Sequence, residues 1–260
     1  MRILNVENLS FSYGRNKVLD SVSMEFFQGT FYGIIGPNGC GKSTLLKNLY
    51  GYLTPETGKI SIYDKDIKHM KARQRARYIS YVPQETNTGF DFSVYDVIAM
   101  GRNPYHSALQ PMSGKDHERI LEAMEETSTT HLMNKSINEL SGGEKQRAII
   151  ARAFAQDSEI ILMDEPVSML DINHQVEIMD LARSLADKNY KTIICVLHDL
   201  NLAAQYTQHI FLMKEGKLIK TGMQDEVLTE EILTDVYDVS VRVREDDESK
   251  VKTILPLSRL

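Results

Sequence analysis

The sequence predicts an α/β protein built on a mostly parallel β-sheet, with a helical segment inserted in its middle. Short apolar runs typical of strands alternate with helical patterns, as in sheets whose crossovers are helices. A glycine-rich loop, Gly36 to Gly41, follows one such run, and an acidic pair, Asp164-Glu165, follows another. Ligands of such sheets bind at the carboxyl ends of the strands. We therefore expect the functional residues at that edge.

The elements are predicted in chain order from periodicity and turn residues. Strands are expected at Ile3 to Val6, Ser21 to Phe26, Phe31 to Ile35, Lys59 to Tyr63, Tyr78 to Val82, Ile160 to Met163 and Lys191 to Leu197. Helices are expected at Ser43 to Tyr52, Lys115 to Glu126, Gly143 to Gln156 and around the apolar face of Val176, Met179, Ala182 and Leu185. Ile210 to Thr221 is typical of a hairpin that turns at Glu215-Gly216.

The helical pattern between Val94 and about Gln156 interrupts the α/β pattern, so it predicts a subdomain. At 260 residues the chain has room for one large domain with a modest insertion. We expect a catalytic core of residues 1–89 and 157–222, a helical subdomain of 90–156 and a C-terminal extension of 223–260.

Composition excludes several classes of protein. The chain is 42% hydrophobic and 25% charged, and its apolar runs, such as Ile193 to Leu197, are about a quarter of the ~20 residues that span a bilayer. Asn5 and Glu7 interrupt the N-terminus where a signal peptide needs an apolar core. Cys40 and Cys195 form no disulfide framework or metal-binding pattern. The net charge of −6 argues against a nucleic-acid partner.

The glycine-rich loop predicts a nucleotide site. Its residues fit the pattern G-x-x-x-x-G-K-[ST] without a mismatch, and they are Gly36, Pro37, Asn38, Gly39, Cys40, Gly41, Lys42, Ser43 and Thr44. Glycines let backbone N–H groups converge on phosphates, and the following helix adds its positive end. Lys42 would reach the β- and γ-phosphates, and the Ser43 hydroxyl would ligate Mg²⁺. The alternative is a glycine-rich turn with a chance lysine, and the strand before the loop argues against it.

The acidic pair predicts hydrolysis. Asp164 ends a buried strand, where a carboxylate can hold Mg²⁺ through water. Glu165 can polarise the water that attacks the γ-phosphate. The alternative is that Asp164-Glu165-Pro166 only caps the strand. A second acid beside the Mg²⁺ carboxylate favours hydrolysis over transfer to another substrate.

A second helix start has unusual glycines. In Leu140-Ser141-Gly142-Gly143-Glu144-Lys145-Gln146-Arg147, Ser141 and Glu144 form a capping-box pattern. A capping box does not explain the two glycines between them. They expose backbone N–H groups, which makes this helix start a second candidate anion site.

With this segment the sequence closely resembles the ATP-binding cassette (ABC) family, whose signature is LSGGQ or, as here, LSGGE. The resemblance implies a P-loop NTPase (RecA-like) core with an N-terminal antiparallel β subdomain and an inserted α-helical subdomain. It also implies that Ser141, Gly142 and Gly143 bind the γ-phosphate of an ATP held by a second subunit. Two copies would then enclose two ATP, each with Mg²⁺, in a homodimer.

Other positions match the family in order. Tyr13 corresponds to the aromatic that stacks on adenine, although taken alone it would be an ordinary surface aromatic. Gln84 corresponds to the glutamine that senses Mg²⁺ and the attacking water. Asp171, in the loop Ser168 to Asp171, corresponds to an acid that reaches across the dimer. His198 corresponds to the switch histidine at the γ-phosphate, where the alternative is a structural histidine at a strand end.

The resemblance also implies partners and a place in the cell. Cassettes of this length, without transmembrane helices, are usual in bacterial importers. The implied partners are two transmembrane permease subunits and, indirectly, an extracytoplasmic substrate-binding protein. The cassette would lie as a peripheral protein on the cytoplasmic face of the cell membrane.

Three segments resemble the cassettes of iron-siderophore, haem and vitamin B12 importers. They are Ser93-Val97 to Gly101-Tyr105, with the feature G-R-x-P-[YH], and the strands Val241-Val243 and Ile254-Leu257. Coincidence in surface loops is the alternative. Phe90, Phe92 and Ser93 are expected in the groove that docks the channel, with a core role for the two phenylalanines as an equal alternative.

Four competing functions stay open. A P-loop kinase would keep the glycine loop but has no use for Leu140 to Glu144. A DNA-repair ATPase of the same superfamily carries a long coiled coil, and a translation factor usually carries two cassettes. An importer for another cargo shares every motif.

Cys40 stands where the family commonly has Ser or Ala. Thiols near a helix N-terminus tend to have a lowered pKa. This predicts that alkylation of Cys40 inhibits the ATPase and that bound ATP protects it.

Overall fold

The computed structural model describes residues 1–84, 91–106, 111–168, 170–248 and 251–259. The chain folds into two compact units. The first unit joins residues 1–69 to residues 192–260, and the second is the continuous stretch 70–191. The three-part division expected from the sequence stays a prediction.

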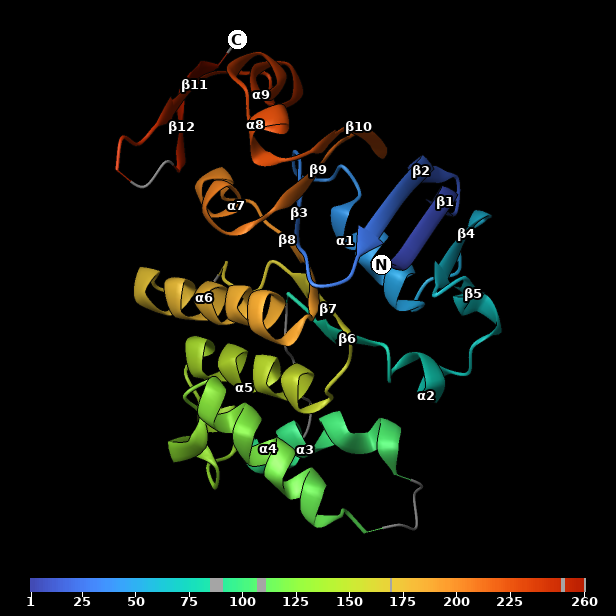
Figure 1. The fold of residues 1–260 in the computed structure, drawn as a ribbon, viewed down its shortest axis with the longest axis vertical. Helices are drawn as coiled ribbons and strands as arrows, with labels where there is room; N and C mark the ends of the chain where they lie inside the picture. Colours follow the sequence, from blue (N-terminus) through green and yellow to red (C-terminus); the bar gives the residue numbers. More distant parts are fainter. Residues whose placement is uncertain (85–90, 107–110, 169, 249–250, 260) are drawn as a thin grey trace. The chain divides into compact units, whose positions relative to one another are not determined.

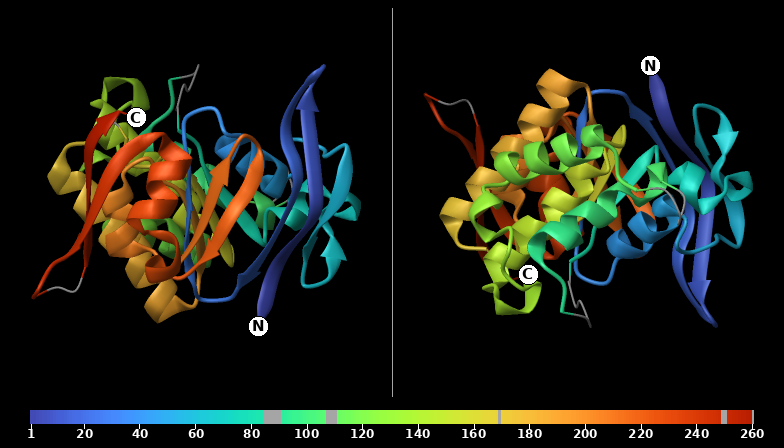
Figure 2. Two further views of the ribbon diagram at one scale, coloured as in Figure 1. Left: turned by 90° about the horizontal axis from the view of Figure 1, so that it is seen from above. Right: turned by 90° about the horizontal axis from the view of Figure 1, so that it is seen from below.

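The first unit contains an antiparallel sheet with the strand order β2-β1-β4-β5. Its strands are β1 (Arg2–Tyr13), β2 (Asn16–Phe27), β4 (Thr57–Ile62) and β5 (Lys65–Asp66). Figure 2 shows β1 and β2 as a long blue ribbon. β1 continues to Tyr13, beyond the predicted Ile3 to Val6. The prediction stopped early because a register shift between Val6 and Leu9, where Asn8 has a positive φ of 47°, breaks the alternation of apolar residues.

The first unit also contains a buried parallel core. β3 (Phe31–Ile35) pairs in parallel with β8 (Thr192–Val196) and β9 (His209–Lys214), and β10 (Lys217–Gly222) returns antiparallel to β9. β3 and β8 are buried along their whole length, which explains their continuous apolar runs. The predicted hairpin turn is confirmed, with positive φ at Glu215 and Gly216.

Five helical segments and a C-terminal hairpin complete the first unit as described. They are α1 (Lys42–Tyr50), η1 (Ile67–His69), α7 (Leu200–Tyr206), α8 (Gln224–Val227), α9 (Glu230–Tyr237), β11 (Val239–Glu245) and β12 (Lys252–Arg259). α1 ends before the predicted Tyr52 because Gly51 adopts a left-handed φ of 74° and caps the helix. The two predicted C-terminal strands are confirmed within β11 and β12.

The second unit combines two parallel strands with helices. Its elements are α2 (Ala72–Arg75), β6 (Ile79–Val82), α3 (Val94–Ala99), η2 (Met100–Tyr105), α4 (Gly114–Glu126), η3 (Thr130–Leu132), η4 (Ile137–Glu139), α5 (Gly142–Ala155), β7 (Ile160–Asp164) and α6 (Ile172–Asn189). α3, α4 and α5 pack on one another, and Figure 1 shows α4 beside α5. The helical stretch expected from Val94 is confirmed.

The predicted α/β fold is therefore confirmed, with periodic apolar runs as the strands and amphipathic runs as the helices. Within the described ranges, no helix combines the length and the apolar character needed to cross a membrane.

Candidate functional site

The phosphate loop follows β3 and is shaped by its glycines. Gly36, Gly39 and Gly41 adopt φ values of 150°, 77° and 103°, where L side chains are rarely found. A Cβ on Gly36 would also collide with the backbone carbonyl oxygen of Met213. The loop therefore presents its backbone, and only glycine fits at Gly36.

The helix that follows the loop begins without a side-chain cap. Gly41 is the N-cap residue of α1, no side chain accepts a hydrogen bond there, and the first turn contains no acid. The positive end of α1 is thus available to an anion. The buried Lys42 donates from Nζ to the carbonyl oxygens of Gly36 (2.7 Å) and Pro37 (3.0 Å), so its charge is held over the loop. This arrangement fits phosphate binding.

Cys40 corrects one expectation. Its side chain is buried, and burial raises the pKa of the thiol, outweighing the attraction of the Lys42 charge. The lowered pKa expected from the helix N-terminus is wrong because loss of solvent costs the thiolate more than the nearby positive charges return. The thiol is therefore mostly protonated and shielded, and we no longer expect rapid alkylation of Cys40.

His198 lies at the same edge of the first unit's sheet as the loop. β3 pairs in parallel with β8, with Ile34 opposite Val196, so both strands end at this edge. His198 is exposed two residues beyond β8. Asp199 next to it caps α7 by accepting from the N–H of Asn201 at 2.7 Å. The strand order thus brings His198 and the loop to one edge.

Tyr13 ends β1 in the first unit. Its side chain is 49% exposed, and its ring stands edge-on to that of Phe11, with 4.9 Å between the centroids. One face of an exposed ring held in this way is available for stacking. Its role at adenine stays a prediction.

In the second unit, Gln84 and Glu165 meet. β6 runs parallel to β7 with Val82 opposite Met163, so the residues after both strands lie at one edge. The Gln84 amide donates from Nε2 to Glu165 Oε2 at 2.6 Å. Glu165 has a positive φ of 49°, which is uncommon for a residue other than glycine. The Gln84 amide thus orients the Glu165 carboxylate, which extends from a backbone in the left-handed region.

Asp164 has a partner that the sequence reasoning missed. The carboxylate is buried and accepts a hydrogen bond from the Tyr81 hydroxyl at 3.0 Å. Burial, and then the charge of Asp164, raise the pKa of Tyr81 far above its usual range, so the hydroxyl keeps its proton. A tyrosine near the end of the strand beside the acid-bearing strand was the available signal. Tyr81 thus orients the Asp164 carboxylate through its Oδ2 atom.

The signature segment starts α5 with the predicted capping box. Glu144 Oε2 accepts from the Ser141 backbone N–H (2.9 Å) and hydroxyl (2.7 Å), and Ser141 Oγ accepts from the Glu144 N–H (3.4 Å). The Ser141 hydroxyl is the main cause that lowers the pKa of Glu144. A Cβ on Gly142 would meet nothing within 4 Å. Packing therefore does not require glycine at Gly142.

Asp171 also has a local role. It caps α6 by accepting from the N–H of His174 at 3.0 Å. The preceding Ser168 hydroxyl donates to the Glu165 carbonyl oxygen at 3.1 Å, and Met169 lies outside the described residues. A contact of Asp171 with a second subunit stays a prediction.

The stretch that resembles siderophore-type cassettes forms α3 and η2. Ser93 caps α3 by accepting from the Asp96 N–H at 3.0 Å. Phe92 is partly exposed, and Phe90 lies outside the described residues. A Cβ on Gly101 would collide with the Arg152 carbonyl oxygen, so this glycine allows η2 to approach α5. Channel docking by Phe90, Phe92 and Ser93 stays a prediction.

Arg102 fixes η2 in place. Its guanidinium donates to Asp116 (2.9 Å) and to the Ala155 carbonyl oxygen (2.8 Å), and lies 4.0 Å from the centre of the Tyr105 ring. Burial alone would raise the Asp116 pKa. Hydrogen bonds from Ser113, His106 and Arg102 outweigh it and hold the pKa well below its usual range. Among the described residues, Arg102 of the G-R-x-P-Y feature thus links η2 to α4 and α5.

The sequence is similar to known ATP-binding proteins. A family model described as ABC transporter matches residues 19–168. The chain is 36% identical over 256 residues to the ferric enterobactin transport ATP-binding protein FepC of Escherichia coli (strain K12), which covers 98% of this chain and 94% of FepC. It is 37% identical over 245 residues to the petrobactin import ATP-binding protein FpuD of Bacillus anthracis, which covers 94% of this chain and 90% of FpuD.

The fold is similar to solved structures. One is a metal-chelate type ABC transporter in an inward-facing conformation, with a TM-score of 0.85, 30% identity, and coverage of 98% of this chain and 97% of that chain. Another is the dimeric post-hydrolysis state of the ATP-binding cassette MJ0796 bound to ADP and Pi, with a TM-score of 0.76, 28% identity, and coverage of 85% and 98%. Each description names a transporter or its ATP-binding part.

Proposed function

Because the chain belongs to the ABC transporter family, whose members bind and hydrolyse ATP, we propose that it is the ATPase subunit of an importer for a ferric siderophore. The phosphate loop is the observation that carries the ATPase proposal. Its glycine backbone, the uncapped start of α1 and the charge of Lys42 together form a cradle for phosphates.

The siderophore proposal is supported by the relatives FepC and FpuD, whose names give ferric enterobactin and petrobactin as cargo. Haem and cobalamin are the alternative cargoes.

Magnesium is proposed as the cofactor of ATP. No group of three or more His, Cys, Asp or Glu side chains in the described ranges could hold a metal ion. Mg²⁺ suits sites of this kind, since it keeps several waters and takes one or two protein oxygens beside the phosphates. We assign it the Ser43 hydroxyl and the Asp164 carboxylate, with the Gln84 amide as a further contact. When bound, Mg²⁺ neutralises charge on the phosphate oxygens.

Glu165 is proposed as the group that takes a proton from the attacking water. In this structure its Oε2 accepts a hydrogen bond from the Gln84 amide, which orients the carboxylate. Lys42 and His198 are proposed to stabilise the γ-phosphate, and Tyr13 to stack on adenine. Tyr81 keeps Asp164 in its orientation throughout.

ABC importer ATPases dimerise and work with membrane permease components. For this chain we propose a homodimer in which Ser141, Gly142 and Gly143 of one copy contact the γ-phosphate held by the other. Two transmembrane permease subunits and an extracytoplasmic substrate-binding protein would complete the importer. The cassette would then lie on the cytoplasmic face of the membrane.

The substitution Glu165→Gln tests the ATPase part. We expect unchanged ATP binding, a loss of turnover of at least about 100-fold, and accumulation of an ATP-bound dimer seen by size-exclusion chromatography with light scattering. Glu118→Gln, an exposed residue of α4, is the matched control and should hydrolyse ATP like the wild type. Turnover near the wild-type rate in Glu165→Gln would contradict the role of Glu165.

The cargo is tested separately. The chain is purified with the membrane protein that binds it, reconstituted in vesicles, and assayed for uptake of ferric enterobactin, haem and cobalamin. Uptake of the siderophore alone supports the proposal, and uptake of haem or cobalamin alone overturns it. Stimulation by DNA or ribosomes, without stimulation by the membrane protein, would overturn the transport function itself.

A further inference from the structure

The last helix of the first unit, α9, ends against the phosphate loop. Tyr237 is the final residue of α9, and its hydroxyl lies close enough to the Gly36 backbone and to the Cys40 thiol for both to influence its pKa. Burial is the main cause that raises the pKa of Tyr237, so the hydroxyl remains protonated at physiological pH. The C-terminal extension thus reaches the first residue of the loop.

A second connection runs through Lys214, the last residue of β9. Its Nζ donates to the Asp235 carbonyl oxygen in α9 at 2.7 Å and lies 3.2 Å from the Asp238 carboxylate just after the helix. The residue before it, Met213, carries the carbonyl oxygen against which Gly36 packs. Lys214 therefore ties α9 to the strand end that contacts the loop.

The turn between β9 and β10 makes a third contact. The N–H of Gly216 donates to the Cys40 carbonyl oxygen at 3.0 Å, and the Gly216 carbonyl oxygen accepts from the N–H of Asp20 at 2.9 Å. The turn is thus fixed on one side to the loop and on the other to β2. Cys40 is thus held by the turn, and Gly36 packs against the end of β9. Lys214 joins that strand end to α9.

These contacts address a weakness of glycine-rich loops. Glycine loses more backbone freedom on ordering than any other residue, and this loop contains Gly36, Gly39 and Gly41. A Cβ on Gly39 would meet nothing within 4 Å, so the outer part of the loop has no packing partner there. Backbone N–H groups bind an anion well only when they already converge on it. Contacts at Gly36 and Cys40 therefore add to the order that Lys42 gives the loop through Gly36 and Pro37.

We propose that α9 braces the phosphate loop, with Lys214 and Tyr237 as positioning residues that keep Gly36 to Cys40 in the conformation that binds ATP. The inference rests on the proposed ATPase function and adds a role for the C-terminal extension. Neither residue belongs to the phosphate loop itself. Loss of either connection therefore weakens ATP binding and leaves the chemical step intact.

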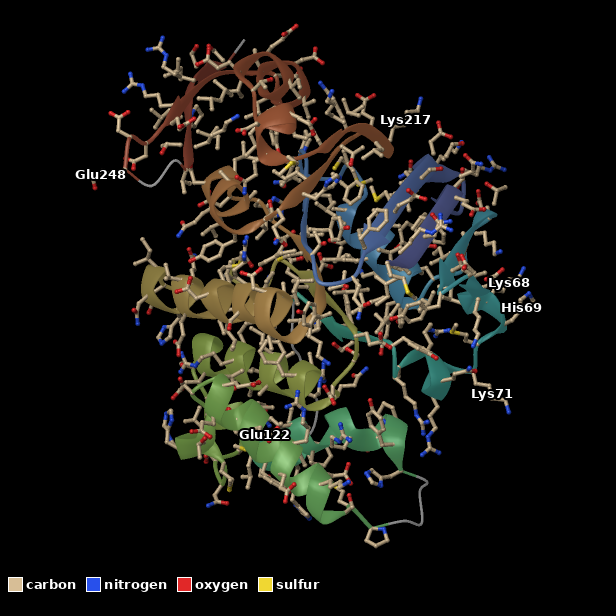
Figure 3. The ribbon with its side chains drawn as sticks, viewed as in Figure 1. Lys68, His69, Lys71, Glu122, Lys217 and Glu248 are labelled. Atoms are coloured by element: carbon tan, nitrogen blue, oxygen red, sulfur yellow. The ribbon has the colours of Figure 1, made fainter. Side chains whose placement is uncertain are left out.

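Two substitutions in the full chain test the brace. Lys214→Met removes the link to Asp235 and Asp238, and Tyr237→Phe removes only the hydroxyl. Loss of one such hydrogen bond is expected to raise the Kd for trinitrophenyl-ATP, and the KM for ATP, about five-fold, with kcat within about two-fold of the wild type. Lys217→Met is the matched control, because Lys217 lies exposed on the same hairpin (Figure 3) and pairs only weakly with Asp20 at 3.5 Å.

The thiol of Cys40 gives a second readout that needs no nucleotide. Wild-type Cys40 is buried, and so is Cys195, so alkylation by N-methylmaleimide should be slow. In Lys214→Met and Tyr237→Phe we expect alkylation at Cys40, located by peptide mass spectrometry, to be several-fold faster. The unfolding temperature is measured in parallel. If Lys214→Met lowers it, Lys214→Arg, which keeps the charge and the donors, should restore both stability and ATP binding.

Kd, KM and alkylation rates in both variants that stay within about two-fold of the wild type would overturn the brace. A reduced kcat at unchanged KM would also overturn it, since the residues would then act on chemistry. Failure of the wild-type chain to bind ATP at all would instead refute the proposed function.

Discussion

Two helices of this chain begin at candidate phosphate sites, and they begin in opposite ways. α1 starts at Gly41 with no side-chain cap and no acid in its first turn. α5 starts at Ser141 with a complete capping box, in which the Glu144 carboxylate accepts a hydrogen bond from the Ser141 N–H. The start of α1 is therefore open to an anion, whereas at the start of α5 the N–H groups of Ser141 and Glu144 already bind side chains of the same helix.

The difference suggests how the work is divided. A carboxylate at a helix N-terminus stabilises the isolated helix but repels a phosphate that approaches the same place. An anion that binds at the start of α5 therefore has to approach close to the Glu144 carboxylate. We therefore expect the phosphate loop to bind ATP in a single subunit and the signature segment to act only when a second subunit presents its nucleotide.

The largest effect is expected at the phosphate loop. Gly36→Ala should reduce ATP affinity at least about 100-fold, because its Cβ would collide with the Met213 carbonyl oxygen and its φ of 150° is unfavourable for alanine. Isothermal titration calorimetry with ATP measures it. Gly39→Ala, where the space is open, is the matched control with a smaller loss. Equal affinities for the two variants would contradict the steric argument.

The next effect is expected at the signature segment. Gly142→Ala meets no steric barrier within the chain, so the isolated subunit should keep its stability and ATP affinity. Its steady-state ATPase rate should fall about ten-fold or more, because the added Cβ lies where the partner's phosphate would approach. Unfolding curves measure the stability, and phosphate-release assays measure the ATPase rate. An unchanged rate would show that this glycine does not meet a nucleotide.

A smaller effect separates capping from function. Ser141→Ala should lower the free energy of unfolding by about 1 kcal/mol, measured by urea titration. Ser113→Ala removes the equivalent capping box of α4 and should cost about the same. Only Ser141→Ala should also lower the ATPase rate. A matching loss of activity in Ser113→Ala would mean that reduced stability explains both.

The smallest effect is expected from pH. The Ser141 hydrogen bonds lower the pKa of Glu144 in the folded state, so its contribution is present above the unfolded value of about 4.3 and is lost as pH falls. In urea titrations, the stability advantage of the wild type over Glu144→Ala should therefore shrink as the pH falls from about 6 to about 4. An advantage that grows as pH falls would show that the carboxylate is not stabilised there.

Much of the fold could be predicted because its determinants are local. The buried run Phe31 to Ile35, the glycine pattern after it and the Ser141 capping box are each written in consecutive residues. Parallel strand order then brings Gln84 to Glu165, as expected for residues that follow neighbouring strands.

What could not be predicted depends on residues far apart in the sequence. The hydrogen bond from Tyr81 to Asp164 joins two strands across 83 positions. The pKa of Cys40 is set by burial, which no neighbouring residue in the sequence reveals, and the helix-end argument alone gave the wrong sign. The second half of β1 was not predicted, because Asn8 has a positive φ and interrupts an otherwise regular strand.

Glu165 carries a further consequence of its backbone. A left-handed φ costs a side-chain-bearing residue about 1–2 kcal/mol, and glycine would avoid that cost. If Glu165 activates the attacking water as proposed, its replacement by glycine would remove this strain and the ATPase activity together. A search for more stable variants should therefore leave this position unchanged.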